Sequence, residues 1–166
     1  YTLIERIGFM KREEILDITI QRLEHFKKTV IESQTTEKEL EIELGDSFLY
    51  FFKVFENSRS LKIFKENDDF LKGIQQVWNS FKHNQSVILI EHHNAARAGV
   101  SLVGGPDVID GSTTWRQEIR QSGRKPNGKL TLAFIKHVQS LTVSETLDKL
   151  INITRVAIKE LENIGK

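Results

Sequence analysis

The sequence contains no cysteine and only two prolines among its 166 residues. Without cysteine the chain has no disulfide, no thiolate nucleophile and no cysteine-ligated zinc, so the protein classes that depend on them are excluded. The scarcity of proline, together with 39% hydrophobic and 28% charged residues, is typical of a folded globular chain. Because a chain of this length usually forms one domain, we predict a single domain over residues 1–166.

Long apolar runs are also missing. The longest, at Phe48–Phe52 and Val87–Ile90, are far shorter than the roughly 20 residues that span a bilayer. The N-terminal residues do not follow the pattern of a secretory signal peptide. We therefore expect a soluble, cytoplasmic protein that does not act at a membrane.

The net charge of +1 hides an uneven distribution along the chain. Residues 1–70 carry 11 Lys and Arg against 15 Asp and Glu, whereas residues 71–140 carry 9 against 4. Clustered Lys and Arg are what a phosphate-binding surface needs, and ordinary surface variation also produces an excess of this size. The middle of the chain is thus the place to look for an anionic partner.

Apolar residues recur every three or four positions in four stretches, which is the spacing of a helix that buries one face. These stretches are residues 11–33, 36–57, 67–83 and 142–164, and residues 61–64 could add a short turn. The second and the fourth open with a capping box, Thr36 with Glu39 and Thr142 with Glu145. We predict a mainly α (α+β) fold built on a four-helix up-and-down bundle.

Residues 85–140 have a different character. Val87–Ile90, Gly99–Val103 and Thr113–Ile119 are short runs with strand character, separated by glycines and prolines. They predict a small antiparallel sheet with long loops. Leu130–Val138 alternates at Leu130, Leu132 and Phe134, so we predict a strand there too, although the same run could start a helix. This stretch would be a β-containing insertion between the third and fourth helices.

The sequence contains no motif for nucleotide hydrolysis and no spacing that indicates a metal site. The run of residues 104–112 lacks the Gly-Lys-Ser/Thr ending of a phosphate-binding P-loop and reads as a turn. His92 and His93 follow a predicted strand, where consecutive side chains point to opposite faces, so they do not easily share one metal ion. We predict no metal site and no cofactor.

Residues 111–129 form the most basic stretch, with five Lys and Arg against one Glu. Trp115 lies among them, and cations interleaved with an aromatic ring can neutralise phosphates and stack on a base. A solvated loop would have the same composition. The candidate nucleic-acid-binding residues, with one arginine from further upstream, are Arg97, Trp115, Arg116, Arg120, Arg124 and Lys125.

The third predicted helix ends in the polar cluster Trp-Asn-Ser-Phe-Lys-His at residues 78–83. Asn79 and His83 are four residues apart, so their side chains share a helix face. This stretch resembles the end of the third helix in the HEPN superfamily, helical bundles that include ribonucleases and RNA-binding partners of prokaryotic toxin, defence and RNA-processing systems. The family motif is an arginine, a polar residue, a few variable residues and a histidine. Asn79 and His83 match it, whereas Trp78 stands in the arginine position.

The resemblance implies metal-independent RNA cleavage in which His83 and Asn79 are the catalytic residues and His83 moves a proton at the ribose 2′-OH. The absent arginine would have stabilised phosphate charge, so we predict a catalytically degenerate module that binds RNA or a protein partner. The chain could also form a homodimer. In one alternative, Arg97, Arg116 or Arg120 supplies the charge and the protein is a ribonuclease.

A second alternative is an enzyme that acts on a small molecule in a pocket between bundle and insertion, lined by His92, His93 or Arg116. Residues 79–84 also have a purely structural interpretation as the polar end of an amphipathic helix. In that case Lys82 and His83 lie favourably near the negative end of the helix, and Asn84 is a left-handed C-cap.

Overall fold

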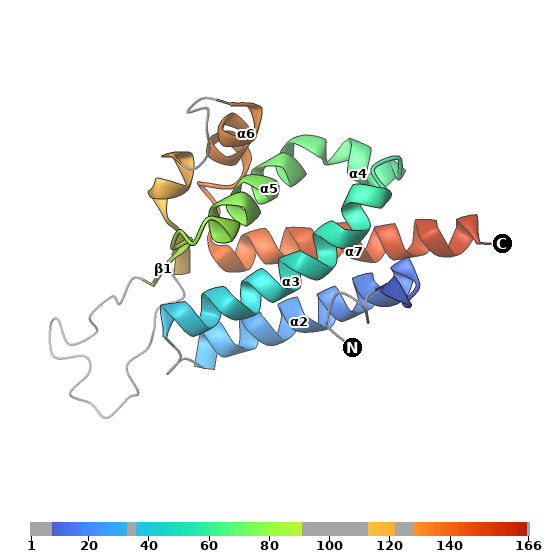
Figure 1. Ribbon diagram of the computed structural model, residues 1–166, viewed down its shortest axis with the longest axis horizontal. Helices are drawn as coiled ribbons and strands as arrows, with labels where there is room; N and C mark the ends of the chain where they lie inside the picture. The colour runs from blue at the N-terminus through green and yellow to red at the C-terminus, as the bar shows by residue number, and fades with distance from the viewer. Residues whose placement is uncertain (1–7, 33–35, 91–112, 122–127, 166) are drawn as a thin grey trace, which may run out of the picture.

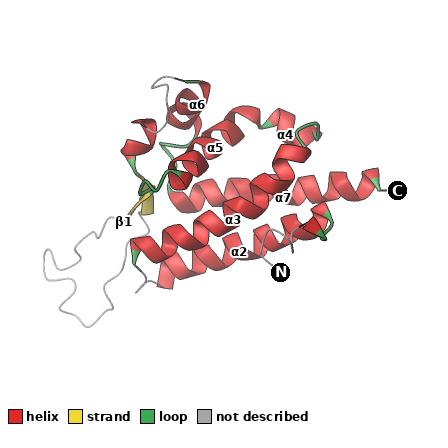
Figure 2. Cartoon of the chain, in the orientation of Figure 1, coloured by secondary structure: helices red, strands yellow, loops and turns green. Residues whose placement is uncertain are grey.

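The structure, a computed structural model, describes residues 8–32, 36–90, 113–121 and 128–165 (Figure 1). Four long helices occur in the predicted order, and shorter helices and two strands lie between them (Figure 2). The predicted mainly α bundle with a small β-containing insertion is therefore confirmed. The elements are α2 (Arg12–Glu32), α3 (Glu37–Asn57), α4 (Lys62–Glu66), α5 (Asp68–Lys82), β1 (Ile88–Ile90), β2 (Thr113–Trp115), the 3-10 helix η2 (Gln117–Gln121), α6 (Lys129–His137) and α7 (Val143–Ile164).

The helix α2 packs along both α3 and α7 and thereby joins the long helices of the bundle. The core between the helices is dominated by the apolar stripe of α3, whose phenylalanine rings contact one another edge-on or stacked. Pairs of this kind add about 0.5–1.5 kcal/mol beyond the burial of their area. The aromatic row of α3 is buried, with Phe48, Phe51, Phe52 and Phe55 each at most 4% exposed.

The helix ends are fixed largely by local hydrogen bonds. Both predicted capping boxes are present, with the hydroxyls of Thr36 and Thr142 accepting from the backbone N–H groups of Glu39 and Glu145. The predicted extra turn is α4, and a distant residue caps it. The carboxylate of Glu160 in α7 accepts hydrogen bonds from the first N–H groups of α4, at 2.8 and 2.9 Å.

The prediction of a strand at Leu130–Val138 is wrong, because these residues form the helix α6 and its C-cap. The alternation at Leu130, Leu132 and Phe134 is misleading. On the helix, Phe134 is buried and Leu132 is exposed. The buried face of α6 packs on α5 at Gly73, where a Cβ would lie 2.6 Å from Val138 Cγ2. A helix thus fits against α5 because Gly73 has no side chain.

The strands β1 and β2 form an antiparallel pair in which Ile88 lies opposite Trp115. This confirms the predicted strand at Val87–Ile90 and the sheet it was expected to join. The chain leaves β2 as the 3-10 helix η2, so the predicted strand over Thr113–Ile119 ends early. The strand predicted at Gly99–Val103 lies outside the described residues. No helix within the described part of the chain has both the length and the apolarity to cross a membrane.

Candidate functional site

The motif residues Asn79 and His83 lie at the end of α5, where Asn79 is half-buried and His83 is exposed. The backbone N–H of His83 donates to the carbonyl oxygen of Asn79 at 3.1 Å. Asn84 has a φ of 59°, and the N–H groups of Asn84 and Gln85 donate back into the helix, to Phe81 and Ser80. This is a Schellman motif with asparagine in the left-handed position, as predicted for Asn84.

Trp78, in the arginine position of the motif, is part of the packing. Its ring is stacked with those of Phe52 and Phe81, at centroid distances of 6.0 and 5.8 Å. The ammonium nitrogen of Lys82 lies 5.5 Å from the centroid of the Trp78 ring, which is within cation–π range. The position that would carry the phosphate-binding charge therefore holds a ring fixed by its neighbours.

Arg116, one of the arginines proposed to supply that charge, is engaged within the fold. Its Nε donates to the carbonyl oxygen of Ile88 at 2.8 Å, and its terminal nitrogen forms an ion pair with Glu37 at 2.9 Å. A guanidinium held by a carboxylate on one side and a backbone carbonyl on another has fewer donors left for a phosphate. Arg116 thus anchors β1 to α3.

The prediction that Trp115 stacks on a base does not agree with its position. The residue is only 3% exposed, and its indole N–H donates to the hydroxyl of Thr146 at 2.9 Å. A ring buried on both faces cannot accept a base without leaving the core. Arg120 belongs to η2 but its side chain is outside the described part, as are Arg97, Arg124, Lys125, His92 and His93.

Two glutamates that the sequence did not single out hold the outer edge of β1. One carboxylate oxygen of Glu41 accepts from the N–H groups of Val87 and Ile88, at 2.8 and 3.1 Å. Glu37 accepts from the N–H of Ile90 at 3.2 Å while its other oxygen pairs with Arg116. In the sequence, the four-residue spacing of Glu37 and Glu41 indicates only that both lie on one face of the helix. It does not identify the backbone groups that they bind, because β1 lies some 50 residues further along the chain.

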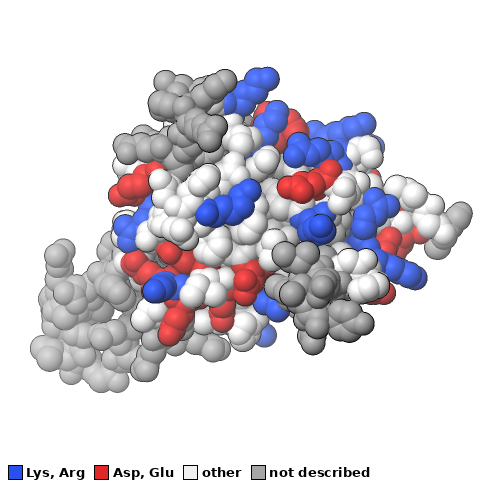
Figure 3. Space-filling view, in the orientation of Figure 1, with Lys and Arg blue, Asp and Glu red and all other residues white. Residues whose placement is uncertain are grey.

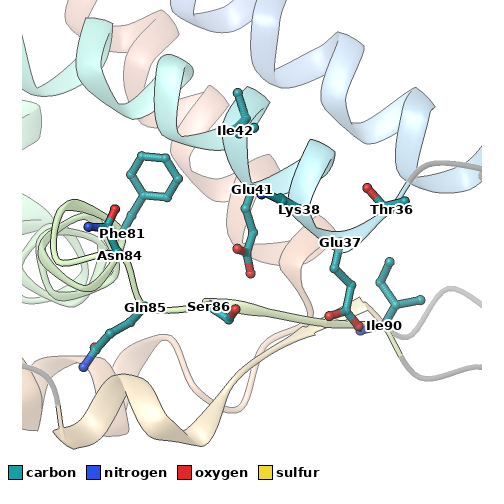
Figure 4. Close-up of a pocket in the computed structure, with 10 residues that line it drawn as sticks. All are labelled: Thr36, Glu37, Lys38, Glu41, Ile42, Phe81, Asn84, Gln85, Ser86 and Ile90. Atoms are coloured by element: carbon teal, nitrogen blue, oxygen red, sulfur yellow. The ribbon is translucent and has the colours of Figure 1, made fainter.

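A groove of about 760 Å³ lies between α3, the end of α5 and the segment leading into β1 (Figure 4). The carboxylates of Glu37 and Glu41 point from α3 toward that segment, and the Phe81 ring lies between the two helices. Phe81 approaches α3 closely because Gly45 there has no side chain. The lining residues are Thr36, Glu37, Lys38, Glu41, Ile42, Phe81, Asn84, Gln85, Ser86 and Ile90.

This groove occupies the place between bundle and insertion where the small-molecule alternative expected a pocket. Arg116, expected to line that pocket, is not among the lining residues, and His92 and His93 fall outside the described residues. Within the described ranges, no group of three His, Asp or Glu side chains is placed to hold a metal ion. The charged residues of the groove lining are Glu37, Lys38 and Glu41.

The groove is lined mainly by uncharged polar and apolar side chains, with Glu37 and Glu41 against Lys38. Residues 37–46 of α3 contain five Asp and Glu against one Lys, and red side chains gather at the lower left of the space-filling view (Figure 3), but of these acids only Glu37 and Glu41 line the groove. Ile42, which lines the groove, is 52% exposed. The carboxylate of Glu41 beside the exposed Ile42 suits a segment that carries both basic and apolar side chains, whereas Glu37 is already paired with Arg116.

Comparisons of the chain with protein-family models, with curated proteins and with solved structures found no significant match.

Proposed function

We propose that this chain is a non-catalytic, HEPN-like binding module of a cytoplasmic protein, and that it holds a basic, amphipathic segment of a partner protein in the groove beside Ile42 and Glu41. The prokaryotic defence or toxin–antitoxin setting is what the resemblance implies. The observation that carries the proposal is the groove itself, in which the exposed Ile42 adjoins the carboxylates of Glu37 and Glu41. Amphipathic helices bind in grooves of this kind by their apolar face.

The surroundings of the motif support binding over catalysis. A ribonuclease of this type needs a cation beside the histidine, and Trp78 fills that position with a stacked ring. Arg116, one of the three arginines that could replace the cation, is paired with Glu37. A protein-binding role needs no such cation and leaves His83 free to serve as the C-cap of α5.

The test is binding of a synthetic helical peptide of leucine and lysine, followed by fluorescence anisotropy. We expect the intact chain to bind it and a leucine–glutamate peptide of the same length to bind far more weakly. Ile42→Gln should weaken binding by about tenfold, the equivalent of 1.4 kcal/mol. The matched control is Val156→Gln on α7, which is 41% exposed and should change nothing.

Equal binding of both peptides, or no effect of Ile42→Gln, would remove the groove as the binding site. Cleavage of total RNA by the intact chain, lost in His83→Ala, would instead establish the ribonuclease alternative. Because His83 is exposed, its replacement should leave the fold intact, so lost cleavage could be assigned to the imidazole.

RNA binding is the second candidate, favoured by one observation. Residues 119–144 contain five Lys and Arg and no Asp or Glu, and Lys129 and Lys136 are exposed on α6. A gel shift with RNA that weakens with added salt, and weakens further when Arg120 and Arg124 are replaced by alanine, would support this candidate over the protein partner. No shift at low salt would remove it.

A further inference from the structure

A second cleft, separate from the groove, lies between α2 and α3, which run side by side (Figure 1). Its volume is about 430 Å³, which is within the range of small-molecule sites. Successive turns of α2 line one side of this cleft, and one face of α3 lines the other. The lining residues are Ile18, Gln21, Arg22, His25, Glu43 and Ser47.

The carboxylate of Glu43, on the α3 side, has an oxygen without a hydrogen-bond donor. This oxygen, Oε2, is buried, and no described residue donates to it. Buried polar atoms in folded proteins nearly always have a partner, so an unpartnered one calls for a donor from outside the chain. The Glu43 side chain as a whole is only half-buried, and the terminal torsion of a glutamate is soft. The carboxylate can therefore turn toward a donor that enters the cleft.

Arg22 places the opposite charge on the α2 side. Its guanidinium carbon lies 4.9 Å from the centroid of the Tyr50 ring, which is itself 5% exposed, so the ring holds the guanidinium by its face. The N–H donors of a guanidinium lie in its plane, and stacking leaves them available to another group. Among the described residues, neither Arg22 nor His25 forms an ion pair with Glu43, although all three line the cleft. A cation and a carboxylate thus line one cleft without neutralising each other.

We propose that this cleft binds a small zwitterion, an amino carboxylate whose ammonium group donates to Glu43 and whose carboxylate accepts from Arg22. The two charges of such a molecule match the two unpaired charges of the cleft. Parallel N–H donors are also the geometry in which arginine binds a carboxylate. The half-buried Ile18 suits an apolar chain between the two charged ends.

Other small ligands fit the lining less well. A purely anionic molecule would be repelled by Glu43, and a purely cationic one by Arg22. A metal ion lacks a ligand set, because no three His, Asp or Glu side chains of the described residues are placed to hold one. The cleft shares no residue with the groove of the proposed function, so either site can exist without the other.

The test is a titration of the full, isotope-labelled chain with matched compounds, followed by NMR. The ω-amino carboxylates from glycine to 6-aminohexanoate carry both charged groups, whereas hexanoate lacks the ammonium group and hexylamine lacks the carboxylate. We expect at least one ω-amino carboxylate to shift the signals of Arg22 and Ser47. Hexanoate and hexylamine should each bind at least about tenfold more weakly than that compound.

Two variants test the two ends of the ligand separately. Glu43→Gln and Arg22→Gln should each weaken binding by at least about tenfold, because each removes one of the charges that the ligand pairs with. Arg22 is exposed, so its replacement should leave the fold intact even if that of Glu43 does not, and circular dichroism checks both. The matched control is Lys28→Gln, which removes an exposed cation of α2 outside the cleft lining and should leave the affinity unchanged.

Three results would overturn the proposal. The first is that no ω-amino carboxylate of the series binds. The second is that hexanoate or hexylamine binds as tightly as the best of them, since one charged end would then suffice. The third is that Arg22→Gln binds as the unaltered chain does, which would place the ligand elsewhere on the molecule.

Discussion

Glu37 and Glu41 lie one turn apart on α3, and together they accept hydrogen bonds from three backbone N–H groups in and just before β1. An unpaired edge strand would present these donors to any other chain. The two carboxylates accept from these donors instead, and Arg116 donates to the carbonyl oxygen of Ile88. Single side chains thus decide how the small sheet attaches to the bundle.

Glu41→Ala should destabilise the fold by about 1–3 kcal/mol, because it leaves the N–H groups of Val87 and Ile88 without their acceptor. Glu41→Gln keeps an acceptor oxygen and should cost less. Urea denaturation measures both changes. The control is Glu56→Ala, an exposed position on the same helix, which should stay within about 0.5 kcal/mol of the unaltered chain. Equal losses for alanine at both positions would contradict the assigned role.

Trp78 and Trp115 show how far residue-level predictions can reach. Trp78 follows the helical spacing of the apolar stripe, so its packing role could be predicted from the sequence. Trp115 lies between threonines and arginines, and its local surroundings indicate an exposed aromatic. Its burial depends on Thr146, 31 positions away, which accepts the indole N–H. No local pattern contains that partner.

At the scale of elements, the end of α5 is defined by its cap. The left-handed backbone of Asn84 lets Gln85 donate to Ser80 and turns the chain toward β1. Asparagine tolerates this conformation, and glycine adopts it without a steric penalty.

Asn84→Gly should therefore leave the stability unchanged or raise it slightly, whereas Asn84→Ala should lower it by about 1 kcal/mol. Thermal unfolding followed by circular dichroism at 222 nm distinguishes the two. A larger loss for glycine than for alanine would mean that the asparagine side chain, rather than its backbone, is what the turn requires.

The secondary elements differ in how well their local sequence predicts them. The long helices and both capping boxes follow from periodicity and from signals within four residues, so their boundaries were predictable. The helix α6 was not predictable in this way, because the apolar residues among its nine positions alternate as in a strand and also fit a helical pattern. What selects the helix is the complementary surface of α5 at Gly73, a contact about 60 residues distant along the chain.

At the scale of the whole molecule, α6 ties residues 128–138 to the bundle through Gly73. Gly73→Ala would place a Cβ 2.6 Å from Val138 Cγ2 and 3.2 Å from the carbonyl oxygen of Ala133. The backbone atom cannot rotate away, so the helices must separate. Overpacking of this kind costs roughly 1–3 kcal/mol, against a gain in helix propensity of up to about 1 kcal/mol.

We therefore expect Gly73→Ala to lower the free energy of unfolding by up to about 2 kcal/mol, measured by urea denaturation. Gly165→Ala is the matched control, because a Cβ there would meet only ordinary contacts at 3.6 Å and beyond. A stabilised Gly73→Ala chain would show that α5 and α6 pack more loosely than the structure indicates.

The sequence by itself determined the mainly α class, the order of the long helices, the capping boxes of α3 and α7 and the core face of each long helix, because these depend on spacing and on neighbours within one or two turns. Only the tertiary structure decided that α6 is a helix, that Trp115 is buried, that Arg116 is paired with Glu37, and that a groove with an exposed Ile42 lies beside α5. Each of these depends on contacts between residues about 30 to 80 positions apart, which chain folding brings together and no local pattern encodes.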